Sequence, residues 1–235
     1  MTNLGERPDD DTPQELLNRL EAQLPAALPS VLRVGGTDPT AGNDLYEAFL
    51  FALVLRAARG EHYQVSFSRR SGESPDTFRL RRSPGRLISG DFTHAVLTLP
   101  GTAKSPLEVH TGVAVVGTSK VAHEADVLVI PAEAASRCRS LGIDPPSHHA
   151  VLVVEGKYYT TPLSLGMGRQ FVGLDADLSR KSVNIMAATV VSQSVSHLLT
   201  GRSRLYEFGV LPGRKAEHDL KERFAIALRD YRHKR

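Results

Sequence analysis

The sequence predicts an α/β fold with a mixed β-sheet flanked by helices, and three patterns along the chain predict it. Residues 45–55 are apolar on almost every side, which is typical of a buried helix. Strand-like alternation, interrupted by glycine and proline, follows over residues 62–130. The C-terminal half then alternates between short apolar runs and helical patterns, an order that favours a sheet with helices packed against it.

The length and composition indicate one domain with a short appendage. The chain has 235 residues, of which 41% are hydrophobic and 23% are charged, and this balance excludes wholesale disorder. Residues 1–12 are acidic and carry nothing apolar after Leu4, so we expect a disordered acidic tail there. Residues 13–235 are expected to form a single domain. It opens with a helix that has Thr12 as its N-cap and Pro13 as its first residue, and that ends at Pro29.

Periodicity and turn residues place the other elements. A helix is expected over residues 44–58. Strands are expected at residues 62–68, 77–82, 96–99, 107–116, 121–130, 150–154, 170–174 and 206–210. Further helices are expected at residues 131–141, 182–199 and 216–231, the first of them stopped by Gly142. Because residues 150–154 form a continuous apolar run, that strand is expected to be buried on both faces.

Composition also excludes several classes of protein. Cys138 is the only cysteine, which excludes an intramolecular disulfide and any metal site built from several cysteines. The longest apolar run, residues 48–55, is much shorter than the roughly 20 residues of a membrane span, and the N-terminus lacks a secretory signal. We therefore expect a cytoplasmic protein with no membrane partner. The net charge of +3 is compatible with nucleic-acid binding if the basic side chains cluster.

Four charged residues form the most informative set of candidate site residues. Asp126 lies inside an otherwise apolar strand, and Glu155 and Lys157 come directly after the apolar run at 150–154. Being two residues apart on a strand, Glu155 and Lys157 are expected on the same face. Glu47 is the only acid of the buried helix after its cap. Carboxylates from separate elements suit Mg²⁺ or Mn²⁺, and a neighbouring lysine can stabilise charge that develops on a phosphate.

Each of these residues also has a simpler interpretation. Glu155 and Lys157 could be a solvated strand end, and Asp126 could be a turn or cap acid. Glu47 could complete a capping box with Asp44. Burying an acid within an apolar strand is energetically costly unless the acid is paired or holds a metal. The acid at Asp126, the apolar run before Glu155 and the apolar helix around Glu47 occur together, which favours a metal site.

The arrangement of Asp126, an apolar strand and then Glu155-x-Lys157 resembles the PD-(D/E)xK nuclease superfamily, over roughly residues 43 to 200. Ala125 stands where the family name has proline. The resemblance implies a restriction-endonuclease-like core and a Mg²⁺-dependent endonuclease that hydrolyses phosphodiester bonds. In that family a helix before the sheet often supplies an extra acid, and Glu47 matches it. Asp126, Glu155 and Glu47 would then serve the metal, while Lys157 would stabilise charge and help to activate water.

The same resemblance implies partners and a biological setting. DNA is the expected nucleic acid, and restriction, repair or antiphage defence is the expected role, with a homodimer or a larger defence complex as the assembly. A catalytically inactive module of the same fold, which binds nucleic acid or a protein partner, is the alternative. An unrelated α/β domain with no nucleic-acid role is a second one.

Clustered arginines are candidates for nucleic-acid contacts. They gather in one expected strand–turn–strand region, at Arg69, Arg70, Arg79, Arg81, Arg82 and Arg86. From this cluster we expect Arg79, Arg81 and Arg82 to contact phosphates, although a charged edge strand would look the same. Arg169 and Gln170, which follow the strand that leads into Glu155 and Lys157, are further expected phosphate contacts.

Two further pairs carry weaker signals. His123 and Glu124 lie beside Asp126 and could assist the metal, although a solvated strand edge is the simpler interpretation. Glu108 and His110, on the preceding strand, are weaker candidates still.

Overall fold

The computed structural model describes residues 41–74, 79–81 and 85–234. The expected acidic tail, the expected helix from Pro13 and the candidate Arg82 lie outside these residues. The described chain contains five α-helices: α2 (Ala41–Gly60), α3 (Ala132–Leu141), α4 (Leu165–Asp177), α5 (Gln193–Gly201) and α6 (Lys215–His233). Its strands are β1 (Gln64–Ser68), β2 (His94–Thr98), β3 (Leu107–Val116), β4 (Ala122–Pro131), β5 (Leu152–Lys157), β6 (Val183–Ala188) and β7 (Leu205–Phe208).

The seven strands form one mixed sheet whose spatial order follows the chain, from β1 to β7. Strands β1 to β5 pair antiparallel with their neighbours, whereas β5, β6 and β7 are parallel to one another. The parallel part needs crossover connections, and α4 and α5 supply them. The expected α/β fold with a mixed sheet flanked by helices is therefore confirmed at this level.

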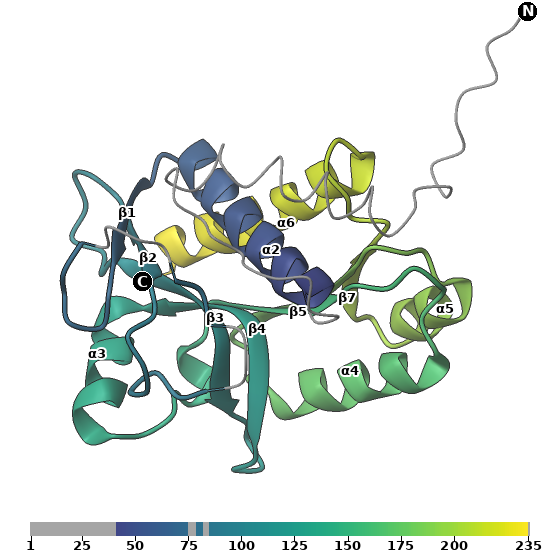
Figure 1. Cartoon of the computed structure of the whole chain (residues 1–235), viewed down its shortest axis with the longest axis horizontal. Coiled ribbons are helices and arrows are strands. Elements are labelled where there is room, and N and C mark those ends of the chain that lie inside the picture. The colour runs from purple at the N-terminus through teal and green to yellow at the C-terminus, as the bar shows by residue number, and fades with distance from the viewer. Residues whose placement is uncertain (1–40, 75–78, 82–84, 235) are drawn as a thin grey trace, which may run out of the picture.

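The helices cover the two faces of the sheet as separate layers (Figure 1). Helices α2 and α6 lie on one face, and α3, α4 and α5 lie on the other. Arg56 of α2 pairs with Glu217 of α6, and Glu61, the residue after α2, pairs with Arg229 and Arg232 of α6. The apolar α2 is buried because the sheet contacts one of its sides and α6 contacts another.

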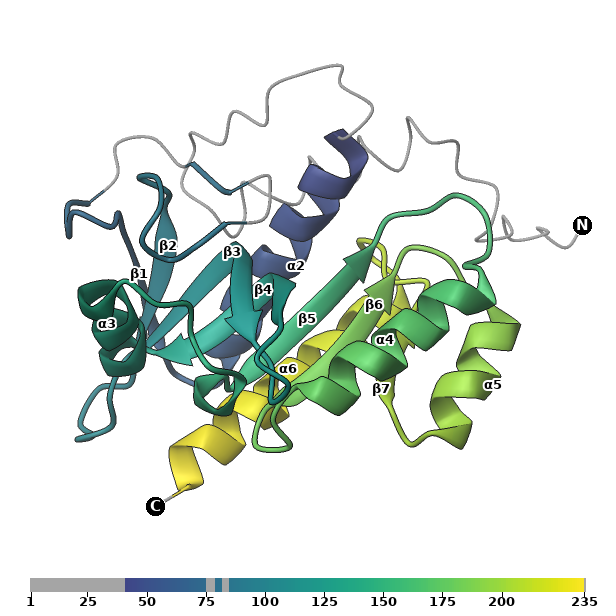
Figure 2. The same cartoon turned by 90° about the horizontal axis from the view of Figure 1, so that it is seen from below.

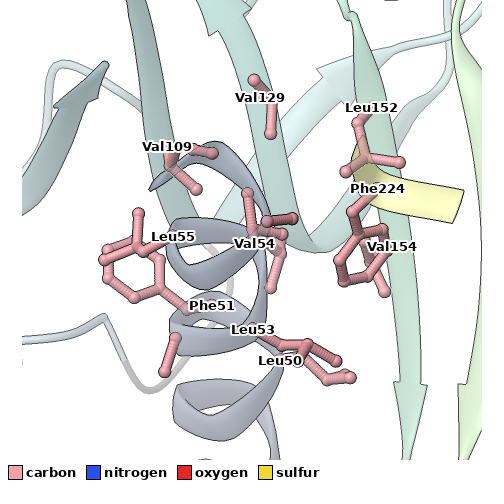
Figure 3. Close-up of a cluster of buried hydrophobic side chains, with 14 of the residues drawn as sticks. Leu50, Phe51, Leu53, Val54, Leu55, Val109, Val129, Leu152, Val154 and Phe224 are labelled. Atoms are coloured by element: carbon pink, nitrogen blue, oxygen red, sulfur yellow. The ribbon is translucent and has the colours of Figure 1, made fainter. Parts of the chain in front are cut away.

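Helix α2 packs its apolar side chains directly onto the centre of the sheet (Figure 3). Leu50, Leu53, Val54 and Leu55 are all fully buried. Their partners come from four elements: Val109 of β3, Val129 of β4, Leu152 and Val154 of β5, and Phe224 of α6. Each such side chain stabilises the fold by about 1.5–3 kcal/mol through burial, so α2 is fixed firmly above β4 and β5.

Several of the expected boundaries are confirmed. The structure has β3 at the expected residues, and it ends α3 at Gly142 in the left-handed conformation. Three expectations are wrong. Residues 170–174 belong to helix α4, and residues 182–199 are divided between strand β6 and helix α5. The described part of the expected strand 77–82 contains no strand, although Arg79 and Thr93 exchange hydrogen bonds.

The failure at β6 has a physical cause. The strand is parallel to both of its neighbours, β5 and β7, and five of its six residues are buried, so it shows no polar alternation that would mark it as a strand. None of the helices in the described part of the chain is long and apolar enough to cross a membrane.

Candidate active site

Three of the four predicted site residues line one cleft. Asp126 comes from β4, and Glu155 and Lys157 come from β5, which is its neighbour in the sheet. The cleft has a volume of about 280 Å³, and α4, which lies below the sheet in Figure 1 and in front of it in Figure 2, forms its other wall. Residues far apart in the sequence, one of them strongly buried, therefore meet at a surface opening.

The cleft exists because β4 and β5 stop pairing at this point. Their registered pairs run from Val129 with Leu152 to Val127 with Val154 and do not continue to Asp126 and Glu155. Instead, the backbone N–H of Gly156 donates a hydrogen bond of 2.7 Å to Oδ2 of Asp126. The Asp126 carboxylate therefore takes a position that a backbone carbonyl would occupy in a continued ladder.

An interruption in β4 turns Asp126 toward this gap. Ala125 packs in the cluster beside α3, whereas Val127, two residues later, packs in the cluster beneath α2. In a regular strand both would lie on the same face. The register places Gly112 of β3 opposite Asp126, and Gly112 has a φ of +57°, a conformation that favours glycine. The side-chain alternation of β4 therefore changes at Asp126.

Lys157 is held beside the carboxylates. Its Nζ lies 2.6 Å from Oε1 of Glu155, and both side chains are only partly exposed. Burial alone would lower the pKa of Lys157, but the charges of Glu155 and Asp126 outweigh burial and raise it. The ammonium group is therefore charged at neutral pH and fixed at the cleft.

The carboxylates around Lys157 repel one another. Burial, followed by the charge of Glu155, raises the pKa of Asp126 to about 7. Burial, followed by the charge of Asp126, raises the pKa of Glu47 to about 9. Burial and Glu155 also raise the pKa of Glu124, which lines the cleft. Four acids thus gather around one lysine, and the raised pKa values of Glu47 and Asp126 keep part of this set protonated at neutral pH.

Glu47 approaches from the opposite layer of the molecule. It is carried by α2, on the face away from α4, and it is not among the residues that line the cleft. Its carboxyl group is nevertheless close enough for the charges of Asp126 and Lys157 to shift its pKa. Glu47 is thus close enough to interact electrostatically with Asp126 and Lys157, but it does not line the cleft itself.

The carboxylates of the cleft suit a metal ion that needs few protein ligands. Within the residues that the structure describes, no group of three or more His, Cys, Asp or Glu side chains is arranged to hold a metal. Mg²⁺, however, is commonly bound by one or two carboxylates, with water and substrate phosphate completing six ligands. Asp126 and Glu155, with further acids nearby, fit that smaller requirement.

The predicted nucleic-acid contacts separate into different environments. Gln170 lines the cleft from α4, and its neighbour Arg169 is exposed on the same helix. Arg79 is also exposed, in a segment outside the strands. Arg81 is buried, and its guanidinium group donates hydrogen bonds to the carbonyl oxygens of Arg86 and Ser89. It does not lie on a surface along which a nucleic-acid backbone could run.

Sequence reasoning missed the wall formed by α4. Met167, Phe171 and Leu174 line the cleft together with Gln170. Their spacing of four and three residues is a helical stripe, and Ser164 provides an N-cap that accepts a hydrogen bond from the backbone of Met167. These signals are present in the sequence, but two nearby glycines favour a loop followed by a strand.

A further contact joins α4 to the β3–β4 turn. Asp177, at the end of α4, accepts hydrogen bonds from Thr118, from Ser119 and from the ring of His123. His123 also lines the cleft. This contact ties the far end of α4, one wall of the cleft, to the β3–β4 turn and to His123.

No family model, curated protein or solved structure matches this chain. Functional assignment therefore depends on the geometry and charge of the cleft.

Proposed function

We propose that the protein is a metal-dependent nuclease that hydrolyses phosphodiester bonds, with DNA as the substrate class. The observation that carries the proposal is the meeting of Asp126, Glu155 and Lys157 in one cleft. They come from two strands, at the point where those strands part. The resemblance of these residues to the PD-(D/E)xK pattern, with a restriction-endonuclease-like core, supports the same conclusion.

Each residue has a distinct role in this proposal. Asp126 and Glu155 would hold Mg²⁺ or Mn²⁺, and Glu47 would complete or orient the site from α2. A divalent cation in such a site lowers the pKa of a bound water and offsets charge on a phosphate. Lys157 would donate its N–H groups toward the negative charge that grows on the phosphate oxygens. Gln170, on the opposite wall, would hydrogen-bond the substrate.

The excess of acid is a reason to expect a cation. Buried carboxylates with raised pKa values destabilise the folded protein at neutral pH, because their charged forms lack compensation. Lys157 alone does not supply enough positive charge for all four acids to be ionised together at neutral pH. A divalent cation would compensate the ionised carboxylates, and a phosphodiester substrate would place its negative charge beside the cation and Lys157.

The alternative is a catalytically inactive module of the same fold. It is favoured by the short contact between Lys157 and Glu155, because this ion pair could be purely structural. An inactive module would bind nucleic acid but would not cleave it, whichever divalent metal is added. Removing the charge of Asp126 would then have no effect on cleavage.

The test is a cleavage assay with supercoiled plasmid, single-stranded DNA and RNA in Mg²⁺, in Mn²⁺ and in EDTA. We expect cleavage only with a divalent metal, and a loss of about 100-fold or more in Asp126→Asn. The matched control is Asp219→Asn, which changes an acid of α6 that pairs with Lys215, far from the cleft lining. If no substrate is cleaved in either metal, or if Asp126→Asn cleaves as fast as the control, the proposal is wrong.

A further inference from the structure

A second pocket, separate from the cleft, lies beside β2 and β3. Its polar lining comes from Arg70, Arg81, Thr93, His94, His110, Thr111 and Arg139. His110 pairs in the sheet with Leu128, two residues after Asp126, so the pocket and the cleft are neighbours on β3 and β4. None of these lining residues belongs to the cleft.

Arg81 is a buried cation with no carboxylate partner among the described residues. It is 9% exposed, and its guanidinium group donates to the hydroxyl of Ser89 and to the two carbonyl oxygens of Arg86 and Ser89. The face of Phe92 lies 4.3 Å from the guanidinium carbon. These contacts use three of its five N–H groups and supply no negative charge, so its own charge remains uncompensated.

The described residues from Gly85 to Phe92 are shaped around the Arg81 side chain. A Cβ atom at Gly85 would collide with the Nη1 atom of Arg81, so no larger residue fits there while the guanidinium keeps its position. Gly90 has a φ of +71°, and a Cβ atom there would collide with the ring of Phe92. Residues 85–92 thus pack around the guanidinium group and leave little of it exposed to solvent.

The neighbouring charges do not compensate Arg81. Glu108 accepts two hydrogen bonds from Arg139, of 2.7 and 2.8 Å, and contacts Nε2 of His110 at 2.8 Å. Its carboxylate is therefore fully engaged. The ring of His94 stacks on His110 with centroids 4.8 Å apart, and its Nε2 lies 3.9 Å from Glu108, beyond hydrogen-bond distance. Within the described chain, the ring nitrogens of His94 make no hydrogen bond.

Two more donors face the pocket. Arg70 is exposed at its edge and makes no ion pair or hydrogen bond with the described residues. The hydroxyl oxygen of Thr93 accepts the backbone N–H of Arg79, which leaves its hydrogen free to donate. Three guanidinium groups thus border the pocket, while the carboxylate of Glu108 is already bound by Arg139 and that of Asp91, between the lining residues Gly90 and Phe92, pairs with Arg69.

We propose that this pocket binds a tetrahedral oxyanion of the phosphate class, with Arg70, Arg81, Thr93 and His94 as its donors. The enclosed part is small, about 20 Å³, which admits little more than one water-sized group. A phosphate oxygen fits there, whereas a base or a sugar does not. Burial and the neighbouring His110 lower the pKa of His94 to about 4, so its ring is neutral and offers a single N–H donor.

The same chemistry could arrive as free inorganic phosphate or as the terminal phosphate of a nucleotide chain. Binding of either is independent of nuclease activity, because anion binding is measured directly and requires no cleavage. Asp126→Asn, which would disable the proposed nuclease, should bind the anion as the wild type does.

The test is NMR of the histidine ring resonances in the full-length protein, with His94 assigned from a His94→Gln variant. Inorganic phosphate and a 5′-phosphorylated dinucleotide are titrated separately in chloride buffer. We expect saturable shifts of the His94 ring, and a Kd raised about tenfold or more in Arg70→Gln, because a charged donor is lost. Arg70 is exposed and has no contact in the described chain to lose, so this variant should fold normally. Arg137→Gln, an exposed arginine of α3 outside the pocket, is the matched control.

Each outcome is informative. A response to inorganic phosphate alone identifies a free-phosphate site, and tighter binding of the dinucleotide identifies a chain terminus. Both results support the proposal if Arg70→Gln weakens them and Arg137→Gln does not. If neither ligand shifts the His94 resonances, or if Arg70→Gln binds as tightly as the wild type, the proposal is overturned.

Discussion

Gly156, between Glu155 and Lys157, is the position where the fold and the proposed site depend most directly on each other. A Cβ atom placed there would lie 2.7 Å from Cδ1 of Leu50 and 3.5 Å from Oδ2 of Asp126. Leu50 is fully buried, so moving its side chain disturbs the packing of its neighbours in the core. Gly156→Ala must therefore push α2 away from β5 or shift the backbone N–H that binds Asp126.

We expect Gly156→Ala to lower the free energy of unfolding by about 1–3 kcal/mol, the usual cost of overpacking a core. Gly173→Ala is the control, because no atom lies within 4 Å of a Cβ at that position of α4, and alanine there should stabilise by up to about 1 kcal/mol. Urea unfolding followed by circular dichroism measures both. Combining Gly156→Ala with Leu50→Ala should cost less than the sum of the two single changes, since the cavity accepts the new methyl group. If Gly156→Ala is as stable as the wild type, the described packing of α2 on β5 is wrong.

The charged residues support three further predictions. Burial and the charge of Asp126 raise the pKa of Glu47 from 4.5 to about 9, so the stability of the folded protein should fall as the pH rises from about 4.5 toward 9. In EDTA at pH 8, Glu47→Gln should therefore melt at a higher temperature than the wild type. Equal melting temperatures would contradict this. Burial would raise the pKa of Glu108, but hydrogen bonds from Arg139 and His110 lower it to about 2, so its contribution is present above about pH 4.5 and is lost as the pH falls toward 2. Glu108→Gln should then lose about 3 kcal/mol at pH 7 and little at pH 2 in denaturant titrations, and a loss independent of pH would refute the cause given. Arg79→Glu should weaken DNA binding and reduce the slope of log affinity against log salt by about one, whereas an unchanged slope would exclude a phosphate contact.

The sequence is sufficient where local pattern and burial agree. The hairpin of β3 and β4 alternates and is separated by a turn, so both strands are predicted closely. The acids are recognisable because Asp126 interrupts an apolar strand and Glu155 follows another. Where a segment is buried on both faces, as in β6, the alternation disappears and the pattern resembles a helix.

The geometry of the cleft could not be predicted in the same way. Gly112 lies opposite Asp126, where the side-chain alternation changes, and only the register of the two strands shows that these residues are opposite each other. The approach of Glu47 from the other layer depends on how α2 crosses the sheet, which no local pattern specifies. Arg81 resembles its neighbours in the sequence, yet it is buried and bound to carbonyl groups.

The most direct test of the proposed mechanism is a paired measurement on Lys157→Ala: the cleavage rate, and the affinity for Mn²⁺. Lys181→Ala, an exposed lysine in the turn before β6, is the matched control. If Lys157 stabilises charge that grows in the transition state, its loss should slow cleavage about 100-fold or more, while Mn²⁺ affinity stays within a few-fold of the wild type. If Lys157 only forms an ion pair with Glu155, cleavage should remain within about threefold of the control, because a partly exposed pair contributes about 1 kcal/mol or less. That second result would contradict the catalytic role assigned to the cleft.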